Sequence, residues 1–315
     1  MRERRHRRGA IDFDFPEAKI ILNESGEPVD IKAYDRNVAT KIIEDFMLVA
    51  NETVAEDYFW QEIPFLYRVH ETPDDDKMKK LVTFLQNFGY TMHMQGGQEI
   101  RPKEVQKLLD KIEGTPEEAM ISRLELRSMK QARYSPDNDG HFGLATQYYT
   151  HFTSPIRRYP DLQIHRIIKE NLHGRLGEKR LSHYGKLLPE AAVWTSSRER
   201  LAEEAERETE KAKKVQYMER RIGEVFDGVI SGISNYGFYV ELPDTVEGMV
   251  HVSELDGDYY VFDEAHYELV GEEGPDHLKQ FIVEARLGDR VIGRGVGRTK
   301  KAAEQEAAYH ALTGI

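Results

Sequence analysis

Residues 151–169, HFTSPIRRYPDLQIHRIIK, combine a rigid loop, a pair of arginines and the start of a helix. Pro155 keeps the residue before it extended, and Pro160 presets the backbone for a first helical turn. The stretch therefore predicts Arg157 and Arg158 on a rigid loop at a helix N-terminus. After Pro160 the helical spacing of apolar residues predicts a stripe that anchors the loop to a core: Ile164, Ile167, Ile168 and Leu172.

The two adjacent arginines have two interpretations. A guanidinium offers a planar fork to phosphate oxygens, and a helix N-terminus adds partial positive charge, so the loop suits a phosphate. Alternatively the pair is structural and is satisfied by backbone carbonyls and Asp161. The physics of these residues alone leaves both interpretations open.

Charge is unevenly distributed along the chain. The 315 residues carry a formal net charge of -12, and 39% are hydrophobic, enough for two or three domains with cores. Residues 225–277 contain thirteen acidic residues and no Lys or Arg, whereas residues 1–8 contain five Arg against one Glu. Residues 278–315 contain seven Lys or Arg against four Asp or Glu. For a nucleic-acid contact the distribution therefore matters more than the sum.

The sequence carries no signal for a membrane. No apolar run approaches the length of a membrane span, and the first residues, MRERRHRRGA, lack the apolar core of a signal peptide. The absence of cysteine excludes disulfides and thiolate metal sites and fits a cytoplasmic protein. We therefore expect a cytoplasmic location and no membrane partner.

Residues 11–59 predict a strand, a hairpin and a helix. Ile11, Phe13 and Phe15 alternate with Asp12 and Asp14, which is typical of a strand with one apolar face, and a hairpin with NESGEP at its turn follows. The two aspartates could hold a metal, since alternate strand residues share a face, but solvation of that face explains them more simply. The helix after residue 38 is expected to bury five apolar side chains: Ile42, Ile43, Phe46, Met47 and Ala50.

Neither the histidines nor the three consecutive aspartates at residues 74–76 predict a metal site. His141, His151 and His165 share no metal-ligand spacing, so we interpret them as polar packing residues. The three aspartates at 74–76 fall in the first turn of a predicted helix, where the helix dipole favours carboxylates.

Four stretches are similar to one family. Residues 152–166, FTSPIRRYPDLQIHR, resemble the signature of the ribonuclease II/ribonuclease R family, 3'-to-5' exoribonucleases with an RNB catalytic domain. Residues 126–152 (LRSMKQARYSPDNDGHFGLATQYYTHF), 7–22 (RRGAIDFDFPEAKIIL) and 41–56 (KIIEDFMLVANETVAE) also resemble that family. The resemblance implies an α+β fold that is the C-terminal part of an RNB domain.

The same resemblance implies roles for single residues. Arg157 matches the family arginine that contacts the scissile phosphate, and Arg158 is expected to bind RNA beside it. Glu44 is expected near the RNA path, although a solvated helix face explains it equally well. The family places a functional glutamate in the helix of residues 198–221, where Glu206 is the best match.

From residue 224 the chain changes to a strand pattern with glycine at turns. Residues 225–255, VFDGVISGISNYGFYVELPDTVEGMVHVSEL, resemble the S1-type OB fold that follows the RNB domain in this family. The resemblance implies that Tyr236, Tyr239 and His251 face single-stranded RNA as a stacking platform. The segment has no cation to neutralise phosphate, and such a barrel would continue with further strands after Glu272.

The C-terminal segment is similar to a different domain. Its loop GPDH and its motif GRGVGRTKKAAEQEAA resemble the second half of the double-stranded RNA-binding domain found at the end of bacterial ribonuclease III. The resemblance implies that His277 enters a minor groove and that Lys300 and Lys301 grip phosphates at a helix N-terminus. Residues 267–272, YELVGE, either end an OB strand or start the sheet of this second domain.

The chain is therefore expected to join three partial domains. Residues 1–221 form the C-terminal part of an RNB domain, residues 222–272 a β-rich partial OB fold, and residues 273–315 a partial β-β-α double-stranded RNA-binding domain. We expect a chimera joined near residues 267–272, which binds single-stranded RNA through its first two parts and double-stranded RNA through its last.

The resemblance also implies a reaction. The complete enzyme would hydrolyse RNA processively from the 3' end, with magnesium, and release nucleoside 5'-monophosphates. The family holds magnesium with aspartates spaced as DxxxxxDxDD, and this sequence contains no such cluster, so we expect no metal ligand in this chain. Arg157 alone cannot supply an enzymatic rate, which predicts that the isolated chain is inactive. The enzyme hypothesis then requires an upstream aspartate cluster or a partner chain. The alternatives are a non-catalytic RNA-binding protein and a non-functional chimeric fragment.

Overall fold

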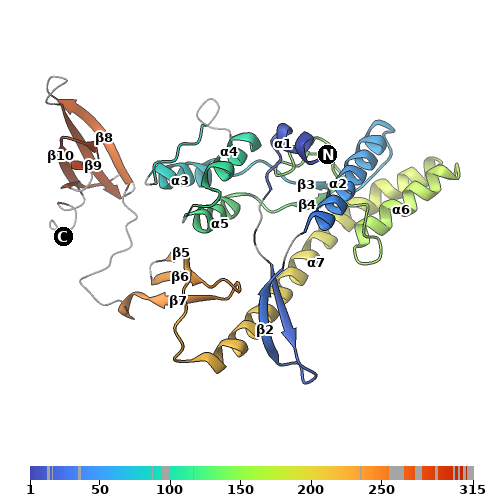
Figure 1. The fold of residues 1–315 in the computed structure, drawn as a ribbon. Helices are drawn as coiled ribbons and strands as arrows, with labels where there is room; N and C mark the ends of the chain where they lie inside the picture. The colour runs from blue at the N-terminus through green and yellow to red at the C-terminus, as the bar shows by residue number, and fades with distance from the viewer. Residues whose placement is uncertain are drawn as a thin grey trace. The chain divides into compact units, whose positions relative to one another are not determined.

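The computed structural model describes the chain except for residues 13–14, 16, 35–36, 87, 94–99, 116, 235, 255–265, 274–278, 288–289, 301, 304–305, 308–309 and 311–315. The chain forms two compact units. One is Met1–Ile233 with Phe238–Val250, and the other is Ser234–Gly237 with His251–Ile315. Helices and separate small sheets make both up, so the predicted α+β class is confirmed (Figure 1).

The elements follow one another along the chain as ten strands, seven α-helices and two short 3-10 helices within the described residues. In order they are α1 (Arg2–Arg8), β1 (Ala18–Leu22), β2 (Pro28–Ala33), α2 (Val38–Trp60), β3 (Tyr67–Val69), α3 (Asp75–Gln86), α4 (Pro102–Ile112), α5 (Glu118–Ser128), β4 (Arg133–Ser135), α6 (Tyr159–Leu172), α7 (Glu178–Met218), η1 (Glu219–Arg221), β5 (Val229–Ser234), β6 (Gly237–Glu241), β7 (Glu247–His251), η2 (Val252–Glu254), β8 (His266–Glu273), β9 (Gln280–Leu287) and β10 (Arg290–Gly297). The strands pair as β1-β2, β3-β4, β5-β6-β7 and β10-β9-β8. No helix among the described residues combines the length and the apolar character that a membrane span needs.

The hairpin predicted around NESGEP is confirmed. Strands β1 and β2 pair antiparallel, and the Asn23 side chain accepts hydrogen bonds from the backbone N–H groups of Ser25 and Glu27 inside the turn. The strand expected at residues 11–15 is wrong for the described residues. Ile11 makes a single backbone hydrogen bond, to the Gly143 carbonyl at 2.7 Å, and sits in a core instead of a ladder. Alternation alone does not provide a pairing partner. Phe13 and Asp14 lie outside the described residues.

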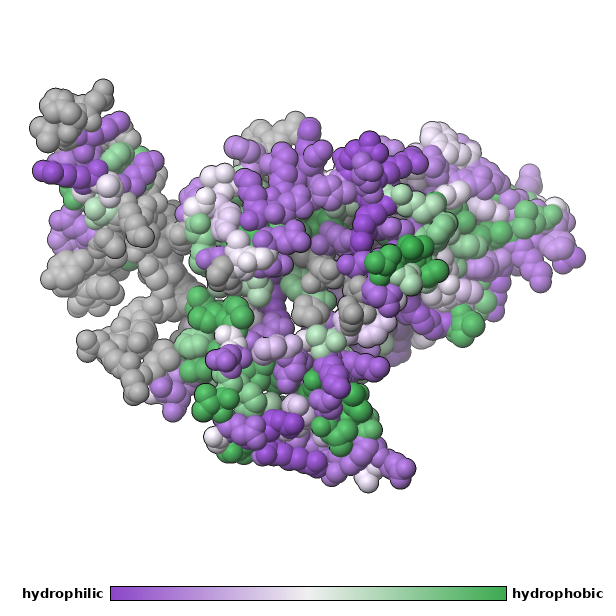
Figure 2. Space-filling model, viewed as in Figure 1, coloured by the Kyte–Doolittle hydropathy of each residue, from purple (hydrophilic) through white to green (hydrophobic). Residues whose placement is uncertain are grey.

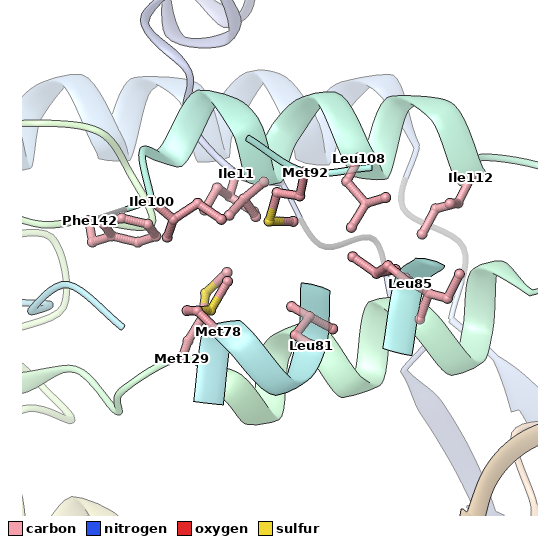
Figure 3. Packing of buried hydrophobic residues seen from close by; sticks show 12 residues of the cluster. Ile11, Met78, Leu81, Leu85, Met92, Ile100, Leu108, Ile112, Met129 and Phe142 are labelled. Atoms are coloured by element: carbon pink, nitrogen blue, oxygen red, sulfur yellow. The ribbon is translucent and has the colours of Figure 1, made fainter. Parts of the chain in front are cut away.

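One core of the first unit is built by three helices, α3, α4 and α5. Their buried faces meet around leucine, isoleucine and methionine side chains, and Ile11 and Phe142 from loops close the cluster (Figure 3). The residues that make up this core are Ile11, Met78, Leu81, Leu85, Met92, Ile100, Val105, Leu108, Ile112, Ile121, Met129 and Phe142.

A second core anchors the loop of residues 151–158. Ile164 and Ile167 of α6 are fully buried against Tyr184, Leu188 and Ala192 of α7, with Ile168 packed at the edge. The predicted apolar stripe is thus confirmed for its first three members. Leu172 is 79% exposed because it is the last residue of α6, beyond this contact.

The face that α2 buries differs from the prediction. Its buried residues are Asn51, Ala55 and Tyr58, all in the C-terminal half, and Ala50 is only half-buried. The N-terminal half exposes the apolar stripe that was expected in a core, and Figure 2 shows hydrophobic surface over this half. Helical spacing predicts an apolar face, but it does not establish that another element covers it. The exposed stripe consists of Val38, Ile42, Ile43, Phe46 and Met47.

In the second unit, residues 267–272 belong to strand β8. It pairs antiparallel with β9 from His266 to Glu273, so YELVGE starts the sheet that continues into β10. The boundary expected between 272 and 273 therefore falls at the last residue of a paired strand.

The motif GRGVGRTKKAAEQEAA acts through close packing. A Cβ atom on Gly295 would lie 2.2 Å from the Ala303 carbonyl oxygen, and one on Gly297 would lie 2.5 Å from the Ala303 amide nitrogen. Only glycine allows the helical residues after Thr299 to lie this near to β10. Ala303 and Ala307 are fully buried in the same contact.

Candidate nucleic-acid interface

The loop before α6 is held by a buried aspartate. Asp161, in the first turn of α6, is fully buried, and its Oδ1 accepts a hydrogen bond from the Ser154 N–H at 2.8 Å. Arg158 donates to the same carboxylate from Nε at 2.9 Å and from Nη2 at 2.7 Å. The N–H groups of Arg157 and Arg158 both point to the Ser154 carbonyl, which closes the turn. This fork-to-fork pair is geometrically specific and stabilises this conformation of the loop.

The two arginines therefore divide the two predicted roles between them. Arg158 is structural, because its guanidinium is committed to Asp161. Arg157 is exposed, and beyond its backbone bond to Ser154 its guanidinium makes no hydrogen bond or ion pair within the described part of the chain. A charged fork on a fixed backbone with its donors free can accept an anion.

Arg157 lines a cavity of about 280 Å³ between α1, α2 and the loop before α6. Arg5 of α1 and Glu44 of α2 lie in the same lining, although they are remote in sequence from the loop. The structure thus brings three of the predicted site residues, Arg157, Arg158 and Glu44, to one cavity.

Asn51 fixes the distance between α2 and this loop. It is buried, its Oδ1 accepts from the Phe152 N–H at 3.0 Å, and its Nδ2 donates to the Tyr149 hydroxyl at 3.2 Å. His165 adds a second tie, with its Nε2 2.8 Å from the Phe152 carbonyl oxygen and its ring stacked on Phe152. The segment that leads into the loop is therefore held from both sides.

Helix α1 reaches the cavity through ion pairs with acidic residues. Arg5 donates to Asp45 at 2.8 Å and to Asp12 at 3.3 Å, and Arg8 pairs with Glu52. In the sequence, the basic run of residues 1–8 is visible only as local charge. The signal that could have connected it to the site is the acidic set on α2, but two stretches of opposite charge do not by themselves define a contact.

The carboxylates at the cavity do not fit a magnesium site. Mg²⁺ takes an octahedral set of oxygen ligands, whereas the lining offers two carboxylates, Asp12 and Glu44, and Asp12 is already paired with Arg5. Within the described residues no three histidine, aspartate or glutamate side chains are grouped so that they could hold a metal ion. Asp14, the other carboxylate considered, lies outside the described residues.

Behind the loop lies a series of buried and half-buried aromatic rings. His70, His141, Tyr149, His151 and Tyr134 follow one another at centroid distances of 5.1 to 5.8 Å. Burial lowers the pKa of His141 to about 3, and burial together with nearby arginine charges lowers the pKa of His151 to about 2. Both rings are therefore neutral at physiological pH and act in packing, so the cationic groups at this site are arginines.

Family models match three parts of the chain. The model of the RNB domain matches residues 1–174, that of the S1 RNA binding domain matches residues 219–275, and that of the double-stranded RNA binding motif matches residues 263–315. The first match covers more than half of the 315 residues and includes the whole cavity lining.

The chain belongs to the RNB family.

Curated relatives of this RNB chain are ribonucleases R. It is similar to "Ribonuclease R 1" of Lactococcus lactis subsp. lactis (strain IL1403), with 48% identity over 269 residues that cover 85% of this chain and 33% of the relative. It is also similar to the ribonuclease R of Aquifex aeolicus (strain VF5), with 46% identity over 301 residues, 95% of this chain and 41% of the relative. The chain thus spans between a third and about two fifths of the length of these relatives.

The fold of the RNB chain is shared with a solved structure. Mycoplasma genitalium RNase R in complex with ribose methylated single-stranded RNA matches with a TM-score of 0.77 and 24% identity. The match covers 94% of this chain and 45% of that chain. At this level of identity the likeness establishes the fold.

The glutamate expected on α7 lies away from the cavity. Glu206 is exposed, and its carboxylate has no hydrogen bond or ion pair within the described residues. Two turns earlier, Glu199 is partly buried, pairs with Arg68, and lies 3.4 Å from the Tyr134 hydroxyl. The repeated glutamates of α7 look alike in sequence, and only the packing of the helix distinguishes them. The role of Glu206 stays a prediction.

The remaining predicted residues lie outside the RNB match. Tyr236 is 69% exposed. Tyr239 lies in β6, and a Cβ atom at Gly232 would lie 3.7 Å from its ring. The Nδ1 atom of His251 is 2.8 Å from the Oγ atom of Ser253. Lys300 is exposed directly after Thr299, whose hydroxyl accepts from the Ala302 N–H and so caps the helical residues that follow. His277 and Lys301 lie outside the described residues. The RNA-binding roles of all these residues stay predictions.

Proposed function

We propose that the cavity around Arg157 binds a phosphate of single-stranded RNA and belongs to a 3'-to-5' exoribonuclease. The observation that carries the proposal is the free guanidinium of Arg157 on a loop fixed by Asp161, beside the N-terminus of α6. The free fork supplies hydrogen bonds to phosphate oxygens, and the helix end adds favourable charge. The kinship with proteins named ribonuclease R supports RNA as the substrate.

In the complete enzyme the reaction would be magnesium-dependent hydrolysis that releases nucleoside 5'-monophosphates. Magnesium would activate water and stabilise the leaving oxygen. The residues of this chain bind and orient the phosphate, and its described carboxylates do not form a magnesium site. We therefore propose that the chain by itself binds RNA without cutting it. A non-catalytic RNA-binding protein and a non-functional chimera remain the rival hypotheses.

We further propose that the chain divides into an RNB part at residues 1–221, an S1-type part after it, and a double-stranded RNA-binding part that begins with β8. Tyr236, Tyr239 and His251 would stack on single-stranded RNA, and Lys300 would contact phosphates of a duplex. The matches to the two RNA-binding models support these assignments. The cytoplasmic location expected from the cysteine-free sequence stays a prediction.

Arg157→Ala tests the phosphate site. We expect it to weaken binding of a fluorescein-labelled twelve-nucleotide oligouridylate by about 3- to 10-fold, and to reduce the slope of log affinity against log salt by about 0.7, because one phosphate contact is lost. Fluorescence anisotropy across a salt series, with a chelator present, measures both quantities.

Arg175→Ala is the matched control, because Arg175 is an exposed loop arginine with no ion pair within the described residues. It should leave affinity within about twofold. Equal losses of affinity in the two variants would mean that Arg157 contributes only a general attraction between basic residues and RNA. In a parallel digestion with magnesium we expect no shortening of the RNA. Release of monophosphates that stops with the chelator and with Arg157→Ala would reveal a metal site in this chain.

A further inference from the structure

A second cavity, remote from Arg157, opens at the C-terminal end of α2. Its volume is about 580 Å³, and its lining contains no Lys, Arg or His. The first cavity contacts α2 as far as Asn51, and Trp60 of the second lies nine residues further, so the two are separated by about 14 Å along the helix. The described ion pairs do not join the two cavities.

The wall of this second cavity is aromatic. Trp60 is 68% exposed, its ring meets Phe59 edge-on at a centroid distance of 5.5 Å, and Tyr148 lies 4.8 Å from Phe59. The face of a Trp ring carries the negative end of the ring quadrupole. The open ring therefore offers a surface for a cation.

Three side chains of the cavity, Glu62, Asp137 and Asn138, offer oxygen atoms that accept hydrogen bonds. Glu62 and Asp137 are exposed and have no ion pair within the described residues. Asn138 Oδ1 is buried and has no hydrogen-bond partner in the same part of the chain. An orphaned buried acceptor costs free energy unless a donor reaches it from outside. Two carboxylates without an ion pair and one amide oxygen without a hydrogen-bond partner thus suit a ligand rich in N–H groups.

Glu62 is held in position by an uncommon backbone conformation. Its φ is 53°, in the left-handed region that favours glycine, and its N–H donates to the Phe59 carbonyl at 3.0 Å as α2 ends. The turn fixes the backbone of Glu62, which follows the exposed Trp60 by two residues in the sequence.

We propose that this cavity docks an arginine side chain from a basic segment of a protein partner. A guanidinium carries donors only, is always charged, and stacks on aromatic faces, so it matches the acceptors and the Trp60 ring together. RNA fits less well. The lining contains no Lys, Arg or His that could neutralise the phosphates, and its two carboxylates would repel them. The proposal is independent of the phosphate site.

Binding of a fluorescein-labelled tetra-arginine peptide to the full chain tests the proposal by anisotropy. We expect Trp60→Ala to weaken binding about three- to fivefold, the size of one exposed cation–π contact. Glu62→Gln with Asp137→Asn should weaken it about five- to tenfold. The same peptide with citrulline in place of arginine should bind at least about tenfold more weakly, because citrulline keeps the shape and loses the charge.

Two matched variants control for general attraction to an acidic chain. Glu204→Gln with Glu208→Gln removes two exposed carboxylates of α7, and Trp194→Ala removes an exposed tryptophan of the same helix. Both should leave the affinity within about twofold. Equal weakening by the α7 pair and the Glu62/Asp137 pair would overturn the proposal.

A short oligouridylate distinguishes the other class of ligand. If Trp60→Ala abolishes oligouridylate binding while the peptide is unaffected, the cavity takes a nucleobase and the proposal is overturned. Circular dichroism and thermal unfolding of each variant establish that a lost signal is not lost folding. Glu62→Gly adds a variant that removes the carboxylate while relieving the left-handed backbone, and it should weaken peptide binding without lowering the midpoint of unfolding.

Discussion

We expect Asp161→Ala to lower the free energy of unfolding by about 2–4 kcal/mol. The substitution leaves the Arg158 guanidinium without its partner, and it removes the acceptor of the Ser154 N–H. Breaking a buried ion pair by removing one member costs more than the pair contributes, because the remaining charge stays desolvated. Urea unfolding followed by tryptophan fluorescence measures the loss, since both tryptophans lie in the first unit.

A double-mutant cycle separates the ion pair from general damage. Asp161→Ala, Arg158→Ala and the double variant should give a coupling energy of at least about 1 kcal/mol, because the two side chains share a bidentate contact. Asp137→Ala, which removes an exposed carboxylate, should change stability by less than about 0.5 kcal/mol. An unfolding midpoint of Asp161→Ala equal to that of the unmodified chain would mean that Asp161 does not hold the loop.

Glu125→Leu should have an effect of similar size and opposite sign. Glu125 is fully buried in α5, and neither carboxylate oxygen has a hydrogen-bond partner within the described residues. Burial raises its pKa to about 8, whereas an unfolded glutamate titrates near 4.5. The folded state therefore keeps a proton that the unfolded state releases. Removing the carboxyl group should stabilise the chain near and above pH 7.

The dependence on pH follows from the sign of this shift. Stability from the protonated Glu125 is fully present below pH 4.5 and is lost as pH rises toward 8, by about 1.4 kcal/mol per unit. Between pH 5 and pH 8 the difference between Glu125→Leu and the unmodified chain should grow by about 3–4 kcal/mol. Comparing the two proteins at each pH cancels the titration of the buried histidines, which both contain.

Glu208→Leu is the control for Glu125, because it removes an exposed glutamate from the middle of α7. Its stability relative to the unmodified chain should not vary with pH by more than about 0.5 kcal/mol. If the difference for Glu125→Leu is also flat between pH 5 and pH 8, the carboxyl group is not buried in neutral form, and a partner from outside the described residues must reach it.

The two cavities of the first unit differ in the ligand that they can take. The cavity at Arg157 is lined by three arginines beside Asp12 and Glu44, and the unpaired guanidinium of Arg157 suits an anion. The cavity at Trp60 has aromatic faces and acceptors and suits a cation. The chain has a net charge of -12, so local composition decides the preference of each cavity. The variants at one cavity therefore serve as further controls for the other.

The sequence by itself determined the family, the fold class and the rigid arginine loop. Short-range chemistry carries the loop and its anchor: two prolines fix the loop, and apolar spacing anchors α6 through Ile164 and Ile167. Each of these features depends on residues that are neighbours in the chain or one helical turn apart, so a single sequence is enough to predict them.

The tertiary structure decided which charges are paired and which faces are covered. It committed Arg158 to Asp161 and left Arg157 free, it brought Arg5 to the cavity, and it placed Glu206 on a solvated face of α7. It also left the N-terminal stripe of α2 exposed where the periodicity predicted burial. The physical reason is the same in each case. Periodicity and charge show which faces a segment has, but which face is covered, and which charge is paired, depends on the elements that pack against it.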